Sequence, residues 1–146
     1  MLSKTSIYAI RALLYISLNS KDNYILINEL SEKLDISFHF LTKILRKLNE
    51  KNILNSNQGP RGGVSLAKPA GKIFLIDIIN ILGDDKIFSN CLLGLKGCGK
   101  EKPCPVHDEL KKITDRTKKL FYTTTIQKLT NKIKKSKLRI SNLKIA

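Results

Sequence analysis

The sequence predicts a mainly α-helical chain with one two-stranded hairpin and a long C-terminal helix. Three observations support this. A short helical segment, a break and a longer helix with a basic outer face occupy residues 28–51, two short strand-like runs follow around a glycine-rich tip, and apolar residues recur at three and four positions after residue 108. A helix-turn-helix followed by a hairpin is a winged helix-turn-helix, so this is the fold class that we expect.

The first helix is expected over residues 3–19, where Ile7, Ile10, Leu14 and Leu18 mark an apolar stripe that Ala9, Leu13 and Ile16 widen. A second, short helix is expected over residues 28–34. The break at residues 35–37 ends it, and Ser37 is a suitable N-cap for the third helix, which should run to about residue 51. The inner face of the third helix carries Phe38, Leu41, Ile44, Leu45 and Leu48.

The outer face of this third helix is basic and rich in hydrogen-bonding groups. In a helix-turn-helix the second helix enters the major groove with its N-terminal half, so this face is the expected DNA-reading surface. The alternative is an ordinary solvated helix face. The candidate DNA-contacting residues are Ser37, His39, Thr42, Lys43, Arg46 and Lys47.

The hairpin is predicted from two short runs, residues 53–56 and 64–67, on either side of a tip at residues 57–63. Arg61 stands next to glycine at this tip. An arginine at such a position can approach a narrow minor groove, where the electrostatic potential is most negative. A plain solvent-exposed turn is the alternative.

Residues 73–83 are too densely apolar for a one-sided surface helix, which predicts a fourth helix buried on most sides. A long helical segment should follow at residues 108–130, although three consecutive threonines at 123–125 weaken it, so residues 126–133 are a candidate for a separate short helix. Its narrow stripe of regularly spaced residues suggests pairing with a second copy of the chain, although packing on its own domain is the alternative. The candidate dimer-interface residues are Leu110, Ile113, Thr117, Leu120, Phe121 and Thr124.

All three cysteines lie in one segment that is broken by glycine and proline, residues 91–107. Six residues separate Cys91 from Cys98, five separate Cys98 from Cys104, and two separate Cys104 from His107. Four soft or borderline donors that fold around one point can hold a metal ion or an iron-sulfur cluster. Three unrelated buried thiols, a structural zinc site and a metal-free thiol switch are the alternatives.

The composition limits the classes of function. A chain of 146 residues can form one domain with an extension, and its net charge of +15 favours a polyanionic partner, of which nucleic acid is the most abundant in a cell. No apolar run of about 18 residues and no leader-like segment occurs, so we expect a cytoplasmic protein without a membrane span. No paired carboxylates, phosphate loop or nucleophile-base set indicates an enzyme.

Several motifs together resemble the Rrf2 superfamily of bacterial winged-helix regulators, and most closely its IscR-like iron-sulfur cluster regulators. The resemblance covers nearly the whole chain. It rests on residues 8–13 of the first helix, on residues 30–37, on residues 59–67 with the order Gly-Pro-Arg-Gly-Gly-Val in the hairpin, and on the three cysteines with His107.

This resemblance implies a transcriptional regulator that forms a homodimer through the long helix and reads a palindromic operator in double-stranded DNA. It implies that Cys91, Cys98, Cys104 and His107 bind an iron-sulfur cluster, and that cluster status, redox state or nitric oxide changes operator affinity. Four-iron members use an Asp of the first helix, where this chain has Ile7, so a 2Fe-2S cluster is favoured over 4Fe-4S.

The resemblance also divides the chain by function. It implies a DNA-binding domain at 1–84, a cluster-binding loop at 85–107, a dimerisation helix at 108–130 and a basic, flexible tail at 131–146. Two departures stand out, since the first cysteine interval is one residue longer than is usual and Gln58 replaces the common arginine before Gly-Pro. This second departure implies that the minor-groove role has moved to Arg61, and Gln58 is a further DNA-contact candidate. From another class of function, a basic nucleic-acid-binding module with a structural zinc site remains an alternative.

Overall fold

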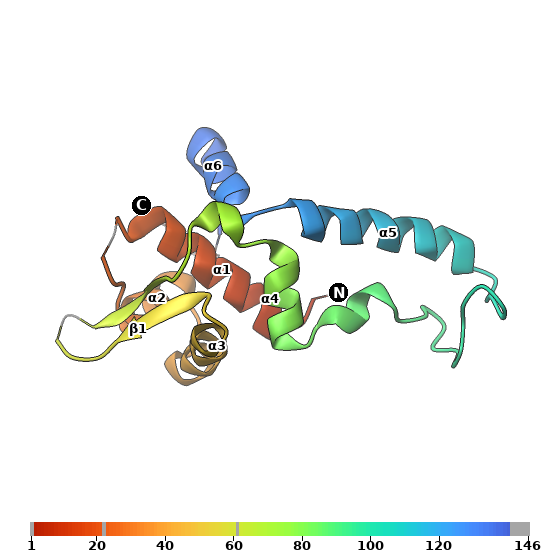
Figure 1. Ribbon diagram of the computed structural model, residues 1–146, viewed down its shortest axis with the longest axis horizontal. Coiled ribbons are helices and arrows are strands. Elements are labelled where there is room, and N and C mark those ends of the chain that lie inside the picture. The colour runs from red at the N-terminus through yellow and green to blue at the C-terminus, as the bar shows by residue number, and fades with distance from the viewer. Residues whose placement is uncertain (1, 22, 61, 141–146) are drawn as a thin grey trace.

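The computed structural model describes residues 2–21, 23–60 and 62–140, so the predicted DNA contact Arg61 lies outside the described residues. The chain is mainly helical with one two-stranded antiparallel sheet, which confirms the predicted fold class (Figure 1). No helix in the described part combines the length and apolar character that a membrane crossing needs. The elements are α1 (Lys4–Asn19), α2 (Ile27–Leu34), α3 (Phe38–Glu50), β1 (Leu54–Asn57), β2 (Gly63–Leu66), η1 (Ala70–Lys72), α4 (Leu75–Leu82), η2 (Asp85–Phe88), α5 (His107–Thr123) and α6 (Ile126–Ser136).

Helix α1 is the central element of the domain, since it contacts α2, α3, α4 and α6. The side chains of Ala9, Leu13 and Ile16 are fully buried, whereas Ile7 is 37% exposed. The prediction therefore found the right helix but placed the centre of its buried face on the wrong stripe. The reason is that α1 is covered from several sides, and helical spacing alone does not rank neighbouring stripes.

The turn between α2 and α3 is fixed by local hydrogen bonds. Asp35 ends α2 in the left-handed conformation with φ of 53°, and the Ser31 hydroxyl donates to the Ile36 carbonyl over 2.6 Å. Ser37 occupies the predicted N-cap position, but its side chain makes no capping hydrogen bond. The predicted core assignment of Phe38 is wrong, because this ring is 42% exposed at the first position of α3.

The hairpin forms the predicted wing. Strands β1 and β2 pair antiparallel, with Leu54 opposite Leu66 and Asn57 opposite Gly63. Ile25 adds an isolated bridge to Val64, in which the two residues exchange backbone hydrogen bonds of 2.8 and 2.9 Å. The base of the wing is thereby fastened to the segment before α2, and the two strands extend away from the domain (Figure 1).

The close approach of Gly63 to Ile25 yields a stability prediction. Gly63 has φ of +131°, and a Cβ there would lie 2.2 Å from the Ile25 carbonyl oxygen. Gly59 also has a positive φ, +109°, but a Cβ there would meet nothing within 4 Å. Gly59→Ala should therefore cost only backbone strain, about 1–3 kcal/mol, whereas Gly63→Ala should cost more because the bridge must open. Urea unfolding of both variants measures the difference, and equal losses would contradict the clash.

The weak point predicted at residues 123–125 separates two helices, α5 and α6, so the dimerisation helix assigned to 108–130 is not continuous. Thr124 and Thr125 are extended and lie antiparallel to residues 73–75, with Leu75 donating to the Thr124 carbonyl and Ile126 donating to the Ile73 carbonyl. The Thr125 hydroxyl then caps α6 by accepting from the Lys128 amide at 3.2 Å. Helix α6 packs on α1, so residues 131–136 belong to an ordered helix and not to the flexible tail that was predicted.

Helix α5 leaves the domain as an arm. Figure 1 shows it extending away from α1 and α4, with the cysteine segment at its far end. Helix α5 contacts α4, and near this end Phe121, which is 7% exposed, meets Phe88 of η2 edge to face at 5.5 Å. The cysteine segment is therefore held between two elements of this arm, η2 and α5.

Candidate metal centre

The cysteine segment begins after η2 and ends at the first turn of α5. Its turns need glycine at two points, since Gly94 and Gly97 have φ of +66° and +71°. The amide of Gly94 donates to the Cys91 carbonyl, and the amide of His107 donates to the Cys104 carbonyl, each over 3.0 Å. These short-range bonds bend the segment back on itself, so that its two ends lie close together.

The bend brings the three thiols together. The sulfur atoms of Cys91, Cys98 and Cys104 all lie within 4.8 Å of one another. The Sγ atoms of Cys91 and Cys104 are 3.8 Å apart, and the Cys98 Sγ lies 3.4 Å from His107 Nδ1. The three thiols that were singled out from the sequence thus converge, and the imidazole of His107 adjoins this group beside Cys98.

The three thiols do not have the same acidity. A hydrogen bond from the backbone of Leu95 is the largest influence on Cys91 and lowers its pKa, with further help from the backbone of Leu93. At Cys98 a backbone hydrogen bond from Cys104 lowers the pKa, but burial and the neighbouring thiols outweigh it, so the pKa is raised. Cys91 is therefore readier than Cys98 to supply the thiolate that a metal requires.

The donor set fits a metal centre. Two sulfur ligands at about 2.3 Å from one tetrahedral ion stand about 3.8 Å apart, which is the separation of the Cys91 and Cys104 sulfur atoms. Beside the four donors lies a cavity of about 280 Å³, which Phe88 and Leu110 also line. The same donors suit one tetrahedral ion or two irons with two protein ligands each.

The predicted reading surface is accessible. Ser37, His39, Lys43 and Lys47 are exposed along α3. Thr42 is half-buried, and its hydroxyl donates to the Phe38 carbonyl over 2.8 Å.

The two remaining candidates of this surface that the structure describes are also exposed. Arg46 pairs with Glu50 at 3.1 Å, an i to i+4 ion pair on the surface of α3. Gln58 is exposed directly after β1.

Phe38 is the DNA-facing candidate that the helical spacing missed. Its ring lies beside the exposed ring of His39, with the ring centres 5.8 Å apart. Phenylalanine is one of the apolar side chains that can contact the methyl group of thymine in the major groove. Helical spacing predicted a core position for Phe38, but the residue is the first of α3 and its ring is exposed.

The stripe predicted for dimerisation is largely uncovered in the single chain. Ile113 is 62% exposed and Leu120 56% exposed, while Leu110, Thr117 and Thr124 are half-buried. The assignment of Phe121 to a dimer interface is corrected, because this ring is buried within its own chain. Two large aliphatic side chains on one face of a projecting helix are typical of a surface that a partner covers.

Comparison with known proteins gives a family match over residues 2–132, to Rrf2, described as an iron-dependent transcriptional regulator. A protein of Aquifex aeolicus that is assigned as an HTH-type transcriptional regulator is 36% identical over 131 residues, or 88% of this chain and 90% of that protein. The HTH-type transcriptional regulator IscR of Xenorhabdus nematophila is 25% identical over 122 residues, or 84% of this chain and 74% of that protein.

Solved structures share the fold. T. potens IscR superposes with a TM-score of 0.73 at 16% identity, covering 95% of this chain and 92% of that one. CymR, the global cysteine regulator of B. subtilis, superposes with a TM-score of 0.70 at 20% identity, covering 90% and 96%. At these identities the likeness establishes the fold and does not identify a ligand of the cysteine segment.

Proposed function

The chain belongs to the Rrf2 family of transcriptional regulators, and from this premise we propose that its affinity for an operator depends on an iron-sulfur cluster held by Cys91, Cys98, Cys104 and His107. Members of the family regulate transcription and are not enzymes, and this chain is likewise a DNA-binding regulator. The observation that carries the cluster proposal is the convergence of three thiols and one imidazole at the end of the α5 arm.

A cluster of the 2Fe-2S type agrees best with the donors. Each iron of such a cluster takes two protein ligands, and the donors here form the pairs Cys91 with Cys104 and Cys98 with His107. Ile7 offers no ligand atom, so α1 adds none at the position that four-iron members use. When bound, the cluster would supply a redox-active group, and histidine in place of a fourth thiolate raises the potential of such a group.

The proposed DNA-binding surface consists of the exposed face of α3 and the wing. Two copies joined along α5, through Ile113 and Leu120, would present two reading helices to a palindromic operator. Half-sites should then be spaced by about 10 base pairs or a multiple of this. Such a regulator acts where the genome lies, in the bacterial cytoplasm.

The route from cluster to DNA runs along the arm. His107 is the first residue of α5, so a ligand bound there fixes the start of the helix. At the other end of α5, Phe121 packs on Phe88 and Thr124 bonds to the start of α4. Gain or loss of a cluster would therefore alter how α5 lies against the domain that carries α3.

DNA selected from a random pool tests the reading surface. Lys43→Ala should weaken binding to all sequences and reduce the salt slope by about one phosphate contact, because an exposed lysine contacts the backbone. Phe38→Ala should instead relax a preference for thymine by about 1 kcal/mol, since it removes an apolar contact. Fluorescence anisotropy over a salt series measures both effects, and Lys86→Ala, at an exposed lysine of η2, is the control. Equal affinity of the unaltered protein for selected and random DNA would contradict the regulator.

A thiol switch is the second candidate, and the 3.8 Å separation of the Cys91 and Cys104 sulfur atoms favours it. A peroxide would oxidise one thiolate to a sulfenic acid, reducing its own O–O bond. The second thiol would then displace water and form a disulfide. Mass spectrometry after peroxide treatment, with and without prior loading of iron, separates the two functions, because bound iron should protect the thiols.

A further inference from the structure

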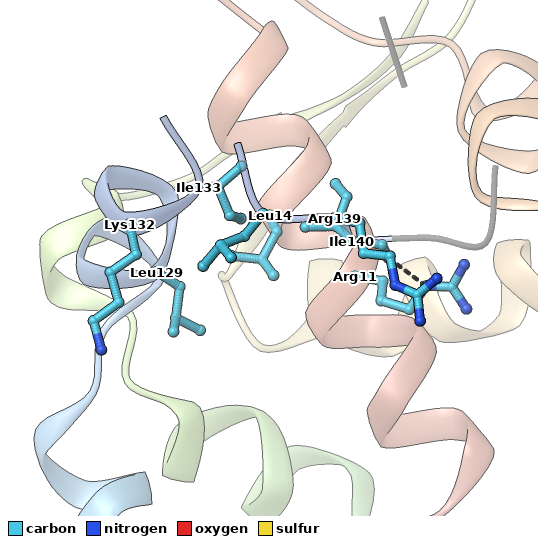
Figure 2. A pocket seen from close by; sticks show the side chains of 8 residues that line it. Arg11, Leu14, Leu129, Lys132, Ile133, Arg139 and Ile140 are labelled. Atoms are coloured by element: carbon cyan, nitrogen blue, oxygen red, sulfur yellow. Dashed lines mark hydrogen bonds between the residues drawn. The ribbon is translucent and has the colours of Figure 1, made fainter. Parts of the chain in front are cut away.

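A groove lies between α1 and α6, away from the cysteine segment. Its walls are Arg11 and Leu14 of α1, Leu129, Lys132 and Ile133 of α6, and residues 138–140 that follow α6 (Figure 2). The cavity has a volume of about 410 Å³. This falls within the range of about 300–1,000 Å³ that is usual for small-molecule sites.

The lining combines aliphatic side chains with cations. No acidic side chain lines the groove, and its three cations form no ion pair with a carboxylate in the described part of the chain. Figure 2 shows Arg11 and Arg139 toward one end and Lys132 at the other. The lining residues are Leu14, Leu129, Ile133, Leu138 and Ile140, with the cations Arg11, Lys132 and Arg139.

Arg11 connects this groove to the helix-turn-helix. Its Nε donates to the carbonyl of Ile140, in the wall of the groove, and its Nη2 donates to the carbonyl of Leu34, each over 2.7 Å. Leu34 is the last residue of α2, directly before the turn into α3. The guanidinium is half-buried and stands 5.5 Å from the centre of the Tyr8 ring, so its position is tightly defined.

We propose that this groove binds a small amphipathic carboxylate, whose hydrocarbon part lies on Leu14, Leu129 and Ile133 and whose carboxylate lies at Arg11 and Arg139. Charge complementarity selects the anion, and the aliphatic lining selects the hydrocarbon body. A carboxylate that accepts from the remaining N–H groups of Arg11 binds the same guanidinium that donates to the carbonyls of Leu34 and Ile140. The ligand thereby acts on the turn that positions α3, which makes the groove a second effector site.

Calorimetry with octanoate tests the binding. Octanoate should bind. Octanol lacks the negative charge and acetate lacks the long hydrocarbon chain, so each should bind at least tenfold more weakly. Arg139→Gln should weaken octanoate about tenfold, because it removes a charge-assisted contact from an exposed residue without disturbing the core. Lys134→Gln is the matched control, since it removes the same charge from α6 outside the groove. Equal binding of octanol, or an equal loss in both variants, would overturn the site.

The regulatory part rests on the proposed function and has its own measurement. Octanoate should change the affinity of the unaltered protein for its selected DNA severalfold, and Arg139→Gln should need about tenfold more octanoate for the same change. Octanoate that binds without altering DNA affinity would overturn the effector role alone. A failure of the proposed function gives a different result. The protein would then show no sequence-specific DNA binding, while octanoate would still bind in the calorimeter.

Discussion

Cys98→Ala is expected to abolish iron binding and the visible absorption of protein reconstituted without oxygen. The unaltered protein should take up about two irons and two sulfides per chain if the cluster is 2Fe-2S. Cys98 is within 4.8 Å of the other two sulfur atoms and next to His107, so its removal leaves three donors, one too few for a cluster that needs four protein ligands, and His107 loses its paired thiol. Anaerobic absorption spectra with iron and sulfide assays measure the loss.

Two further variants make the cluster experiment specific. His107→Ala should leave a weaker or altered spectrum, because the three thiolates remain, and it should change the affinity for DNA. Thr114→Ala removes a side chain that lines the same cavity but is no soft ligand, so it should retain the full spectrum. An unchanged spectrum in Cys98→Ala would contradict the cluster site. If the protein instead contains one zinc ion per chain and has no visible absorption, the site is a structural zinc site and holds no cluster.

Leu120→Glu is expected to dissociate the proposed homodimer. Leu120 is 56% exposed in the single chain, on the same face of α5 as Ile113. Burial of one such side chain contributes about 2 kcal/mol, and a twofold interface uses it twice, so the loss is about 4 kcal/mol or roughly three orders of magnitude in Kd. Repulsion between two facing carboxylates adds to this loss. Sedimentation velocity over a concentration series measures the dissociation.

Tyr122→Glu is the matched control for the dimer. Tyr122 is 52% exposed and lies on the opposite face of α5, about 200° around the helix from Leu120. It gains the same charge and should leave the dimer intact. Leu120→Glu should also lose affinity for a palindrome while binding a single half-site as before, and a variant that still sediments as a dimer would place the interface elsewhere.

The order of elements could be predicted from the sequence because each is encoded locally. Glycine positions marked the wing tip, an apolar stripe marked each core helix, and the crowding of Cys91, Cys98, Cys104 and His107 into a broken segment marked the centre. Such signals depend on residues that are close together in the chain, so they can be recognised without knowledge of the tertiary structure. The convergence of the four donors followed for the same reason, because the glycine turns lie between them.

Local spacing could not decide which side of an element is covered. Phe38 has the spacing of a core residue and is exposed, whereas Phe121 has the spacing of an outward stripe and is buried on Phe88. Each outcome depends on what packs against the helix from a distant part of the chain. Phe38 stands at the first position of α3 and stays 42% exposed, whereas Phe88 of η2 packs against Phe121 near the C-terminal end of α5.

The sequence by itself determined a winged helix-turn-helix with a cysteine centre on a long helix, since turn residues and periodicity act over a few positions. The threonine run marked a weak point in the sequence, but only the tertiary structure showed what ends α5 at Thr123, because the pairing of Thr124 and Thr125 with residues 73–75 joins segments about 50 positions apart in the chain. It likewise decided that α6 turns back onto α1 and creates the groove at Arg11. Both features arise from contacts between segments that no local pattern relates.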